Sequence, residues 1–158
     1  MSARIKIRNA VQTDQRLLVE MIEQIGSADP VGYTPGWIGS ADGLAYVRYH
    51  IEKGWVVVAE HDGKAVGHCA WSIKQGRPHQ AYVRYAELET VFVSPELRSK
   101  GIAEALVKAF STYCSQHALS VQTVHAVPDP RTLALFERLG FVEARRFMIR
   151  GAAEGRPI

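Results

Sequence analysis

Apolar residues alternate with basic ones at the start of the chain and then recur at helical spacing. Ile5 and Ile7 are separated by a polar residue, a period of two that predicts a strand with one buried face. From about Thr13 the apolar residues follow at steps of three and four: Leu17, Leu18, Met21, Ile22 and Ile25. This spacing predicts a helix with one apolar face, and Gly26 stands where a C-cap glycine would end it.

The middle of the chain predicts a loop, a second helix and a hairpin. Residues 27–42 contain two prolines and three glycines, which is typical of a loop, and a helix is expected over about 43–53. A strand over 55–60, the turn His61-Asp62-Gly63-Lys64 and a returning strand over 65–73 form a hairpin with an Asp-Gly signal. A polar turn then leads to a long strand that ends near Val93.

The last third of the sequence alternates helix and strand. Residues 97–116 contain an apolar stripe at helical spacing, formed by Ile102, Leu106, Ala109, Phe110 and Tyr113. A strand over 121–127 completes a β-α-β crossover. Asp129 can cap and Pro130 can open a helix through Leu139, after which Gly140 stops the helix and Phe141 starts a last strand. The order β α α β β β α β α β predicts an α/β (α+β) fold, in which helices flank a mixed sheet.

Composition narrows the class of protein. A chain of 158 residues that is 47% hydrophobic fits one globular domain over residues 1–158. The net charge of +3 comes from basic and acidic residues spread along the sequence, so a nucleic-acid partner is not expected. No stretch approaches the roughly 18 apolar residues of a spanning helix, and the N-terminus has no apolar signal region, so neither membrane contact nor export is expected.

The two cysteines, Cys69 and Cys114, stand far apart and belong to no Cys-x-x-Cys pattern. No histidine pair has ligand spacing either, so we expect neither a disulfide framework nor a metal site. A reducing, cytoplasmic location is the natural interpretation.

The segment from Arg98 to Ala103 has the pattern of an anion-binding loop. It follows a strand that closes with Val93-Ser94-Pro95, and it opens an amphipathic helix. Arg98, Gly101 and Ala103 fit Arg/Gln-x-x-Gly-x-Gly/Ala, in which small residues let backbone N–H groups approach a pyrophosphate. Free N–H groups and the dipole at the helix start favour an anion, and Lys100 adds positive charge.

This strand-loop-helix and the later run Leu135-Phe136-Glu137-Arg138-Leu139-Gly140-Phe141 resemble the A and B motifs of the GNAT superfamily of N-acetyltransferases. The resemblance covers about residues 85–141. It implies a mixed, mostly antiparallel sheet with a βαβ crossover at the cofactor site, and acetyl-coenzyme A as the co-substrate. It also implies that pantetheine lies between strands that separate near Val93 and Val127. Carried over by position, the cofactor-binding residues would be Val91, Phe92, Val93, Arg98, Ser99, Lys100, Gly101, Ile102, Ala103, Asp129 and Phe136.

The sequence departs from the family pattern in three places. The family usually has Asn at the position of Asp129, and at the position of Phe136 it has a Tyr that often protonates the departing thiolate. Only residues 142–158 follow Phe141 in this sequence, and the usual closing hairpin is therefore expected to be shortened. A partner subunit, as in a homodimer, would be one way to complete the sheet.

Glu87 and Glu89 are the candidates for the catalytic base. They are two residues apart, so on a regular strand they share a face with Val91 and Val93, and in the family a Glu at the position of Glu87 often serves as the base. The other interpretation is a solvated strand face. A histidine at position 125 is expected as an interior residue, with contact to the reacting centre as the alternative.

The acceptor is expected to be an amine on a small molecule or a peptide, and the sequence does not identify it. Tyr33, Trp37, His79 and Tyr85 are candidate acceptor-binding residues, because rigid aromatic side chains often line small-molecule clefts, although packing roles are equally expected. Two alternatives to acetyl transfer stay open: a transferase that uses a longer acyl-coenzyme A, and a binding or regulatory module that keeps the cofactor loop without catalysis.

Overall fold

The computed structural model describes residues 4–27, 34–126 and 129–145. A five-stranded sheet in the order β1-β2-β3-β4-β5 lies at its centre. Strands β1 to β4 run antiparallel to their neighbours, and β5 pairs parallel to β4. The strand bounds are β1 Ile5–Asn9, β2 Val56–His61, β3 Lys64–Gln75, β4 Arg84–Val93 and β5 Gln122–Val124. The predicted mixed, mostly antiparallel fold is therefore confirmed.

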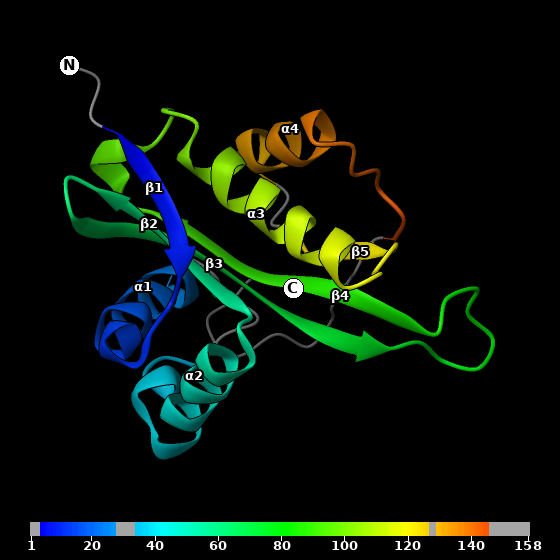
Figure 1. Cartoon of the computed structure of the whole chain (residues 1–158), viewed down its shortest axis with the longest axis horizontal. Helices are drawn as coiled ribbons and strands as arrows, with labels where there is room; N and C mark the ends of the chain where they lie inside the picture. The colour runs from blue at the N-terminus through cyan, green and yellow to red at the C-terminus, as the bar shows by residue number, and fades with distance from the viewer. Residues whose placement is uncertain (1–3, 28–33, 127–128, 146–158) are drawn as a thin grey trace, which may run out of the picture.

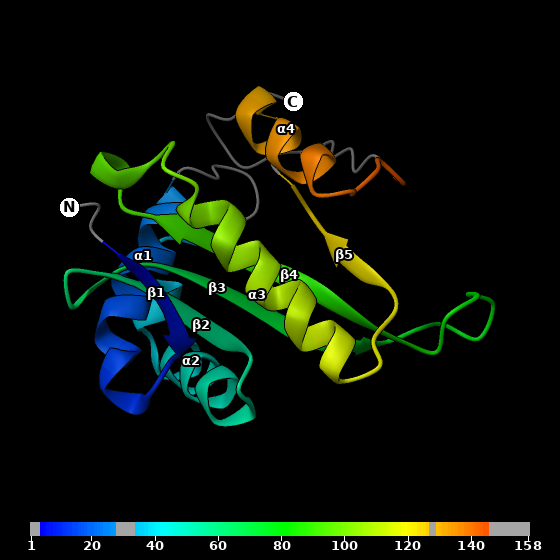
Figure 2. The same ribbon diagram turned by 45° about the horizontal axis from the view of Figure 1, so that its top comes forward.

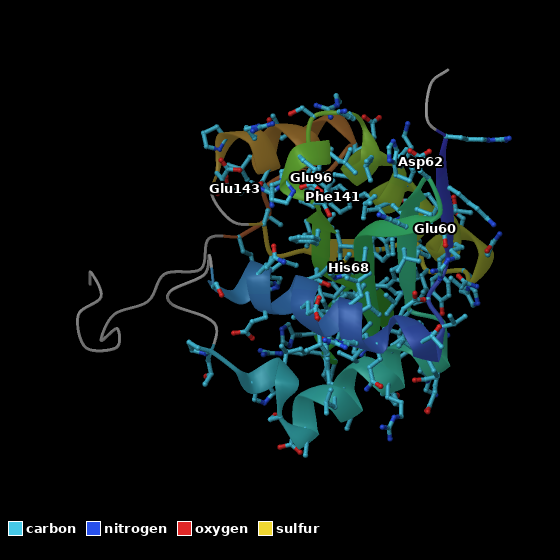
Figure 3. All side chains as sticks on the ribbon, turned by 90° about the vertical axis from the view of Figure 1, so that its left-hand side faces the viewer. Glu60, Asp62, His68, Glu96, Phe141 and Glu143 are labelled. Carbon is cyan, nitrogen blue, oxygen red and sulfur yellow. The ribbon has the colours of Figure 1, made fainter. Side chains whose placement is uncertain are left out.

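Four helices cover the two faces of this sheet. The bounds are α1 Gln15–Ser27, α2 Ala41–Lys53, α3 Ile102–Gln116 and α4 Pro130–Arg138. Figures 1 and 3 show α1 and α2 on one face and α3 and α4 on the other. Short 3-10 turns at Gln12–Asp14, Trp37–Gly39 and Pro95–Leu97 join strands and helices. None of the helices within the described residues has the length and apolar character that a membrane-spanning helix needs.

Two apolar clusters hold the helices to the sheet, one on each face. The cluster under α3 contains the two largest fully buried side chains, Trp71 and Phe110, together with Leu106. The cluster under α1 and α2 contains Leu18 and Val47 with the facing strand residues. Because apolar side chains on both faces are removed from water, the sheet is a rigid support for residues along β4.

A β-bulge in β4 decides which residues of that strand face which helices. Ala70 pairs with Thr90 and Trp71 pairs with Leu88, so Glu89 is the extra residue. Leu88 points into the α3 cluster, whereas Glu89 contacts α2 and Thr90 contacts His68. The consecutive residues Glu89 and Thr90 thus both lie on the face that α1 and α2 cover, which a regular strand does not allow.

The buried histidine on the α1 face shows this packing. His68 is fully buried, and in Figure 3 it lies between the sheet and α1. Its Nε2 is 2.8 Å from Oγ1 of Thr90, and its Nδ1 is 3.4 Å from Sδ of Met21. Burial lowers the pKa of His68 to about 4, so the ring is neutral at neutral pH.

The predicted strand that starts at Phe141 is wrong for residues 141–145, which form no strand. Helix α4 ends in a Schellman motif, in which Phe141 N donates to the Phe136 carbonyl at 2.9 Å and Gly140 N donates to the Glu137 carbonyl at 3.0 Å. Gly140 has φ +90°, the left-handed conformation that this motif requires. The Phe141 ring then packs edge-on against Phe136, with centroids 5.3 Å apart, so the chain folds back instead of extending.

Candidate functional site

The parallel strands β4 and β5 separate partway along their length. They pair from Ala86 with Gln122 to Leu88 with Val124, after which β5 ends while β4 continues to Val93. Beyond Leu88 the β5 side of β4 therefore has no partner strand among the described residues. Figure 2 shows the chain leaving β5 toward α4, which lies on the same side of the sheet as α3. An extended ligand can take the place of a strand there.

The loop that follows β4 presents backbone N–H groups at the start of α3. Ser99 and Gly101 both have positive φ, +65° and +81°. Gly101 is the N-cap of α3, and no side chain caps that helix end. A Cβ placed on Gly101 would meet no atom within 4 Å, so the space above the helix start is open. This arrangement suits a pyrophosphate, which accepts hydrogen bonds and is attracted by the helix dipole.

The side chains around this loop tie it to β4 and to α4. Arg98 Nε donates to the Val93 carbonyl at 3.0 Å, and its guanidinium lies 6.0 Å from the centre of the Phe92 ring. Arg131, in the first turn of α4, donates to the hydroxyl of Ser99. Sequence reasoning missed Arg131, because its position is set by the packing of α4 and not by a local motif.

The other predicted cofactor residues near this loop differ in how much of each side chain is accessible. Lys100 is exposed, whereas Ile102 is buried and Ala103 half-buried in the α3 cluster, so these two can offer a ligand only backbone groups. Asp129 caps α4, accepting from Thr132 N at 3.1 Å and from Thr132 Oγ1 at 2.7 Å. These bonds lower the pKa of Asp129. Phe136 is only 6% exposed and packs in the α3 cluster.

On the opposite face of β4 the structure has a cleft of about 610 Å³. Its wall combines aromatic, carboxylate and aliphatic side chains from α1, from the segment that precedes α2, from α2 and from β4, together with the residue that follows β5. The lining residues are Ile22, Thr34, Trp37, Ile38, Tyr46, Glu87, Leu88, Glu89, Thr90 and His125. Glu87 and Glu89, the two predicted catalytic residues, are thus brought together in one cleft.

Glu89 is fixed by donors from α2 and β3. Its Oε2 accepts from the Tyr46 hydroxyl and lies 3.0 Å from His50 Nε2, and its Oε1 accepts from Ser72 Oγ at 2.5 Å. Burial opposes the charged form, but the hydrogen bonds from His50, Ser72 and Tyr46 outweigh it and lower the pKa of Glu89 to about 2. Glu89 is therefore a fixed negative charge at neutral pH.

His50 and Tyr46 complete this network. His50 Nδ1 lies 2.9 Å from the Tyr46 carbonyl oxygen, so both ring nitrogens of His50 face oxygen atoms. Burial and the Glu89 carboxylate raise the pKa of the Tyr46 hydroxyl well above its usual value, which keeps it a donor. Neither residue is identifiable from sequence, because α2 reaches Glu89 only through the tertiary fold.

Glu87 has freer surroundings. Its Oε2 lies 3.7 Å from Lys74 Nζ, and its Oε1 lies 3.1 Å from His125 Nε2. The His125 side chain is 81% exposed, so the expectation of an interior histidine was wrong. The physical reason is that β5 ends at Val124, one residue earlier, and the chain leaves the sheet before it can be covered.

The bulge also corrects the predicted face of the two glutamates. Glu87 and Glu89 face α2 and the cleft, whereas Val91 packs against the α3 cluster and Val93 is buried within it. The extra residue at Glu89 shifts the alternation by one position, so the carboxylates and these valines lie on opposite faces.

Of the predicted acceptor-binding residues, Trp37 lines the cleft, where its ring packs edge-on against Tyr46 with centroids 5.7 Å apart. Tyr85 lies outside the lining and packs against Tyr82, with ring centroids 5.1 Å apart. His79 lies in the exposed loop between β3 and β4, which Figure 1 shows projecting past the helices. Tyr33 falls outside the described residues.

Neither cysteine has the surroundings of a nucleophile. Both are free and buried, and burial raises the pKa of the Cys69 thiol and raises that of Cys114 to about 11. Within the described part of the chain no group of three or more metal-binding side chains comes together.

Comparison with known proteins agrees with this geometry. The pattern of the acetyltransferase (GNAT) family matches residues 20–141. Among curated proteins none matches the sequence significantly.

Three solved structures illustrate the shared fold. An aminoglycoside N-acetyltransferase AAC(6')-Iy in complex with CoA is 20% identical, covers 97% of each chain and has a TM-score of 0.76. A predicted acetyltransferase with acetyl-CoA from Clostridium acetobutylicum is 16% identical over 94% of this chain and 96% of its own, with a TM-score of 0.74. A ribosomal-protein-alanine N-acetyltransferase from Brucella melitensis biovar Abortus 2308 is 17% identical over 94% of this chain and 100% of its own, with a TM-score of 0.64. At these identities the likeness establishes the fold, and together with the family pattern over most of the sequence it shows that the chain belongs to the acetyltransferase (GNAT) family.

Proposed function

We propose that this protein is an acetyl-coenzyme A-dependent N-acetyltransferase that acts on a primary amine. One observation carries the proposal. Past Leu88, strand β4 continues beyond the end of its pairing with β5, and the loop after β4 leads to the N-terminus of α3. The same strand carries Glu87, which lines the cleft on the sheet face that α1 and α2 cover. A donor site and an acceptor site thus meet along one strand, as a direct transfer between two substrates requires.

The residues around Arg98 to Ala103 fit the cofactor. The open space above Gly101 and the uncapped helix end suit the pyrophosphate, and the exposed Lys100 adds positive charge. Among the described residues no strand pairs with the β5 side of β4 near Val91 and Val93, and this edge suits the pantetheine amides, which can pair as a strand does. When bound, acetyl-coenzyme A supplies an acetyl thioester whose carbonyl an amine can attack.

Glu87 is the base in this proposal, and Glu89 is not. An ammonium of ordinary pKa near 10.4 is about 0.1% neutral at pH 7.4, and reaching the neutral amine costs roughly 4 kcal/mol. Glu87 can accept that proton because its carboxylate lies in the cleft wall and, unlike Glu89, is not held by hydroxyl donors among the described residues; its contacts are Lys74 at 3.7 Å and His125 at 3.1 Å. Glu89, which is already held by three donors, instead fixes the aromatic wall and keeps the cleft negative.

The departing thiolate needs no acid from the protein. Phe136 has no hydroxyl and is buried, so it packs and does not protonate. A thiol of ordinary pKa near 8.5 can leave as the thiolate and take a proton from water at pH 7 to 8. Proton removal from the amine is therefore the step for which a side chain of the protein is needed most.

Two features of the cleft support an amine that carries positive charge. Glu87 and Glu89 lie in its wall, and Trp37 and Tyr46 supply aromatic surface beside them. Such a site favours a cation next to an apolar group, whether on a small molecule or on a peptide. The acceptors named for the similar structures, aminoglycosides and a ribosomal-protein alanine, are both amines.

A screen of amine acceptors with acetyl-coenzyme A, in which free thiol is measured, tests the proposal. We expect at least one primary amine to be acetylated, and we expect Glu87→Gln to lower turnover roughly 100-fold at pH 7 with little change in cofactor affinity. The loss should shrink as pH rises, because the acceptor then loses its proton unaided.

Two other outcomes would contradict the proposal. If only longer acyl-coenzyme A donors react, the enzyme is an acyltransferase of another donor class. If acetyl-coenzyme A raises the melting temperature but no amine is acetylated, the protein is a cofactor-binding module.

We also propose a single domain over residues 1–158, a cytoplasmic location and no metal, nucleic-acid or membrane partner. The location is supported by the two buried free thiols of Cys69 and Cys114, which suit a reducing compartment. A homodimer stays a prediction, and sedimentation of the purified protein would measure it.

A further inference from the structure

His125 lies at the point where β5 leaves β4. Val124 is the last β5 residue that pairs with β4, opposite Leu88, and His125 follows directly. Its Nε2 is 3.1 Å from Oε1 of Glu87, and both side chains line the cleft. Because 81% of the His125 side chain is exposed, its ring connects Glu87 to solvent.

The other ionisable groups near Glu87 cannot take up a proton from it. Lys74, on β3, lies 3.7 Å from both Glu87 Oε2 and Glu89 Oε1, and an ammonium has no lone pair to accept a proton. The oxygens of Glu89 are occupied by Ser72 on β3 and by Tyr46 and His50 on α2. Among these contacts, only the His125 imidazole can accept a proton and exchange it with water at neutral pH.

We propose that His125 is the proton-transfer partner of Glu87; this inference rests on the function proposed above. A proton leaves the acceptor ammonium for a carboxylate oxygen of Glu87. It then passes from Glu87 Oε1 to Nε2 of His125, which restores the carboxylate and forms an imidazolium. The imidazolium releases its Nδ1 proton to water, and proton exchange with water then returns the ring to the tautomer whose Nε2 is free. The net change is one proton moved from the amine to solvent.

The pair is a better base than the carboxylate alone. An ordinary glutamic acid has a pKa near 4.3 and an ordinary imidazole one near 6.5. A base works best when the pKa of its conjugate acid lies near the operating pH, so passing the proton to the imidazole improves the match at pH 7 to 8. His125 acts through Glu87 and needs no contact with the substrate.

Two substitutions separate proton transfer from positioning. His125→Gln keeps a hydrogen-bond donor beside Glu87 but cannot carry the proton, and His125→Phe removes both properties. His117→Gln is the matched control, because His117 is also an exposed histidine but lies at the C-terminal end of α3 and does not line the cleft. Its ring stacks on Tyr113, with ring centroids 3.9 Å apart. The rate of each variant is divided by the wild-type rate at the same pH, which cancels the titration of the acceptor.

For His125→Gln we expect this ratio to fall about fourfold between pH 6 and pH 8, because an imidazole of ordinary pKa near 6.5 is about one-quarter neutral at pH 6 and almost fully neutral at pH 8. For His117→Gln the ratio should stay near one. A flat ratio with full activity in His125→Gln would overturn the proposal. The same holds if only His125→Phe is impaired and its ratio is flat, because a donor beside Glu87 would then be sufficient.

The contact itself has a readout that needs no activity. The ring protons of His125 can be observed by NMR, and Glu87→Gln should change their chemical shifts at a fixed pH, because the group 3.1 Å from Nε2 changes from a carboxylate to an amide. Unchanged chemical shifts would overturn the pairing. If wild-type protein acetylates no amine, the proposed function fails together with the relay, whereas an active enzyme with a flat ratio refutes the relay alone.

Discussion

Replacing Glu89 by Gln tests the assignment of separate roles to the two cleft carboxylates. The change keeps the shape of the side chain and removes its charge. It also puts an amide donor in place of one oxygen that now accepts from donors on β3 or α2. Because the Tyr46 and Ser72 hydroxyls lose a charged acceptor, the folded state should be destabilised.

The size of this effect follows from the pKa of Glu89. Its lowering from an ordinary 4.5 to about 2 corresponds to about 3 kcal/mol of preference for the charged form in the folded state. The side chain is 16% exposed and borders an open cleft, so solvent screening reduces the expected loss to about 2 kcal/mol. For a chain of this length the melting temperature should fall by about 4–8 °C.

Urea unfolding of wild type and Glu89→Gln at pH 7, 5, 4 and 3 measures the difference in unfolding free energy. Because the folded pKa is lowered, the stabilisation is complete above pH 4.5 and is lost as pH falls toward 2, so the gap between the two proteins should close below pH 4.5.

Glu87→Gln is the matched control, since its partners Lys74 and His125 are exposed and its loss of stability should stay below about 1 kcal/mol. A gap that is absent at pH 7, or that does not change between pH 7 and pH 3, would refute the network. If Glu89→Gln proved as inactive as Glu87→Gln while remaining as stable as wild type, the base would be Glu89.

Three further predictions test the rest of the structure. Gly101→Val should abolish the stabilisation by acetyl-coenzyme A, about 2.7 kcal/mol at 100 times its dissociation constant, because a branched side chain is strained at φ +81° and fills the phosphate space; normal binding in a thermal-shift titration would show that the loop is misplaced. Phe136→Tyr should change turnover by less than about tenfold between pH 6 and 9, since the thiolate leaves unaided; a variant that is active where wild type is inert would contradict the enzyme assignment. Wild type should lose up to about 3 kcal/mol of stability as pH falls from 6.5 to 4, where only the unfolded histidine at position 68 binds a proton, and His68→Gln should not show this loss. Chemical unfolding across that range measures the difference, and an unchanged pH dependence would contradict burial of a neutral ring.

The local pattern of the sequence determined most of the elements. Periods of two and 3.6 residues predicted β1, α1 and α3, because a buried face imposes its spacing on any chain that forms it. Turn and cap signals predicted the hairpin and α4, and α2 was expected after the loop that precedes it. The loop from Arg98 to Ala103 was also predictable, since a left-handed glycine before a helix is a local requirement. The resemblance to the family followed from the order of these elements together with this loop.

The tertiary structure alone decided how the cleft works. Nothing local to Glu89 predicts a bulge, which arises from the register between β3 and β4. The bulge places Glu87 and Glu89 on one face of the sheet and Val91 and Val93 on the other. The partners that separate the two carboxylates, His50 for Glu89 and His125 for Glu87, are 39 and 38 residues away in sequence (89 − 50 and 125 − 87). Spacing along the chain determines which face a residue takes within one element, whereas charge, burial and proton transfer depend on which elements the fold packs together.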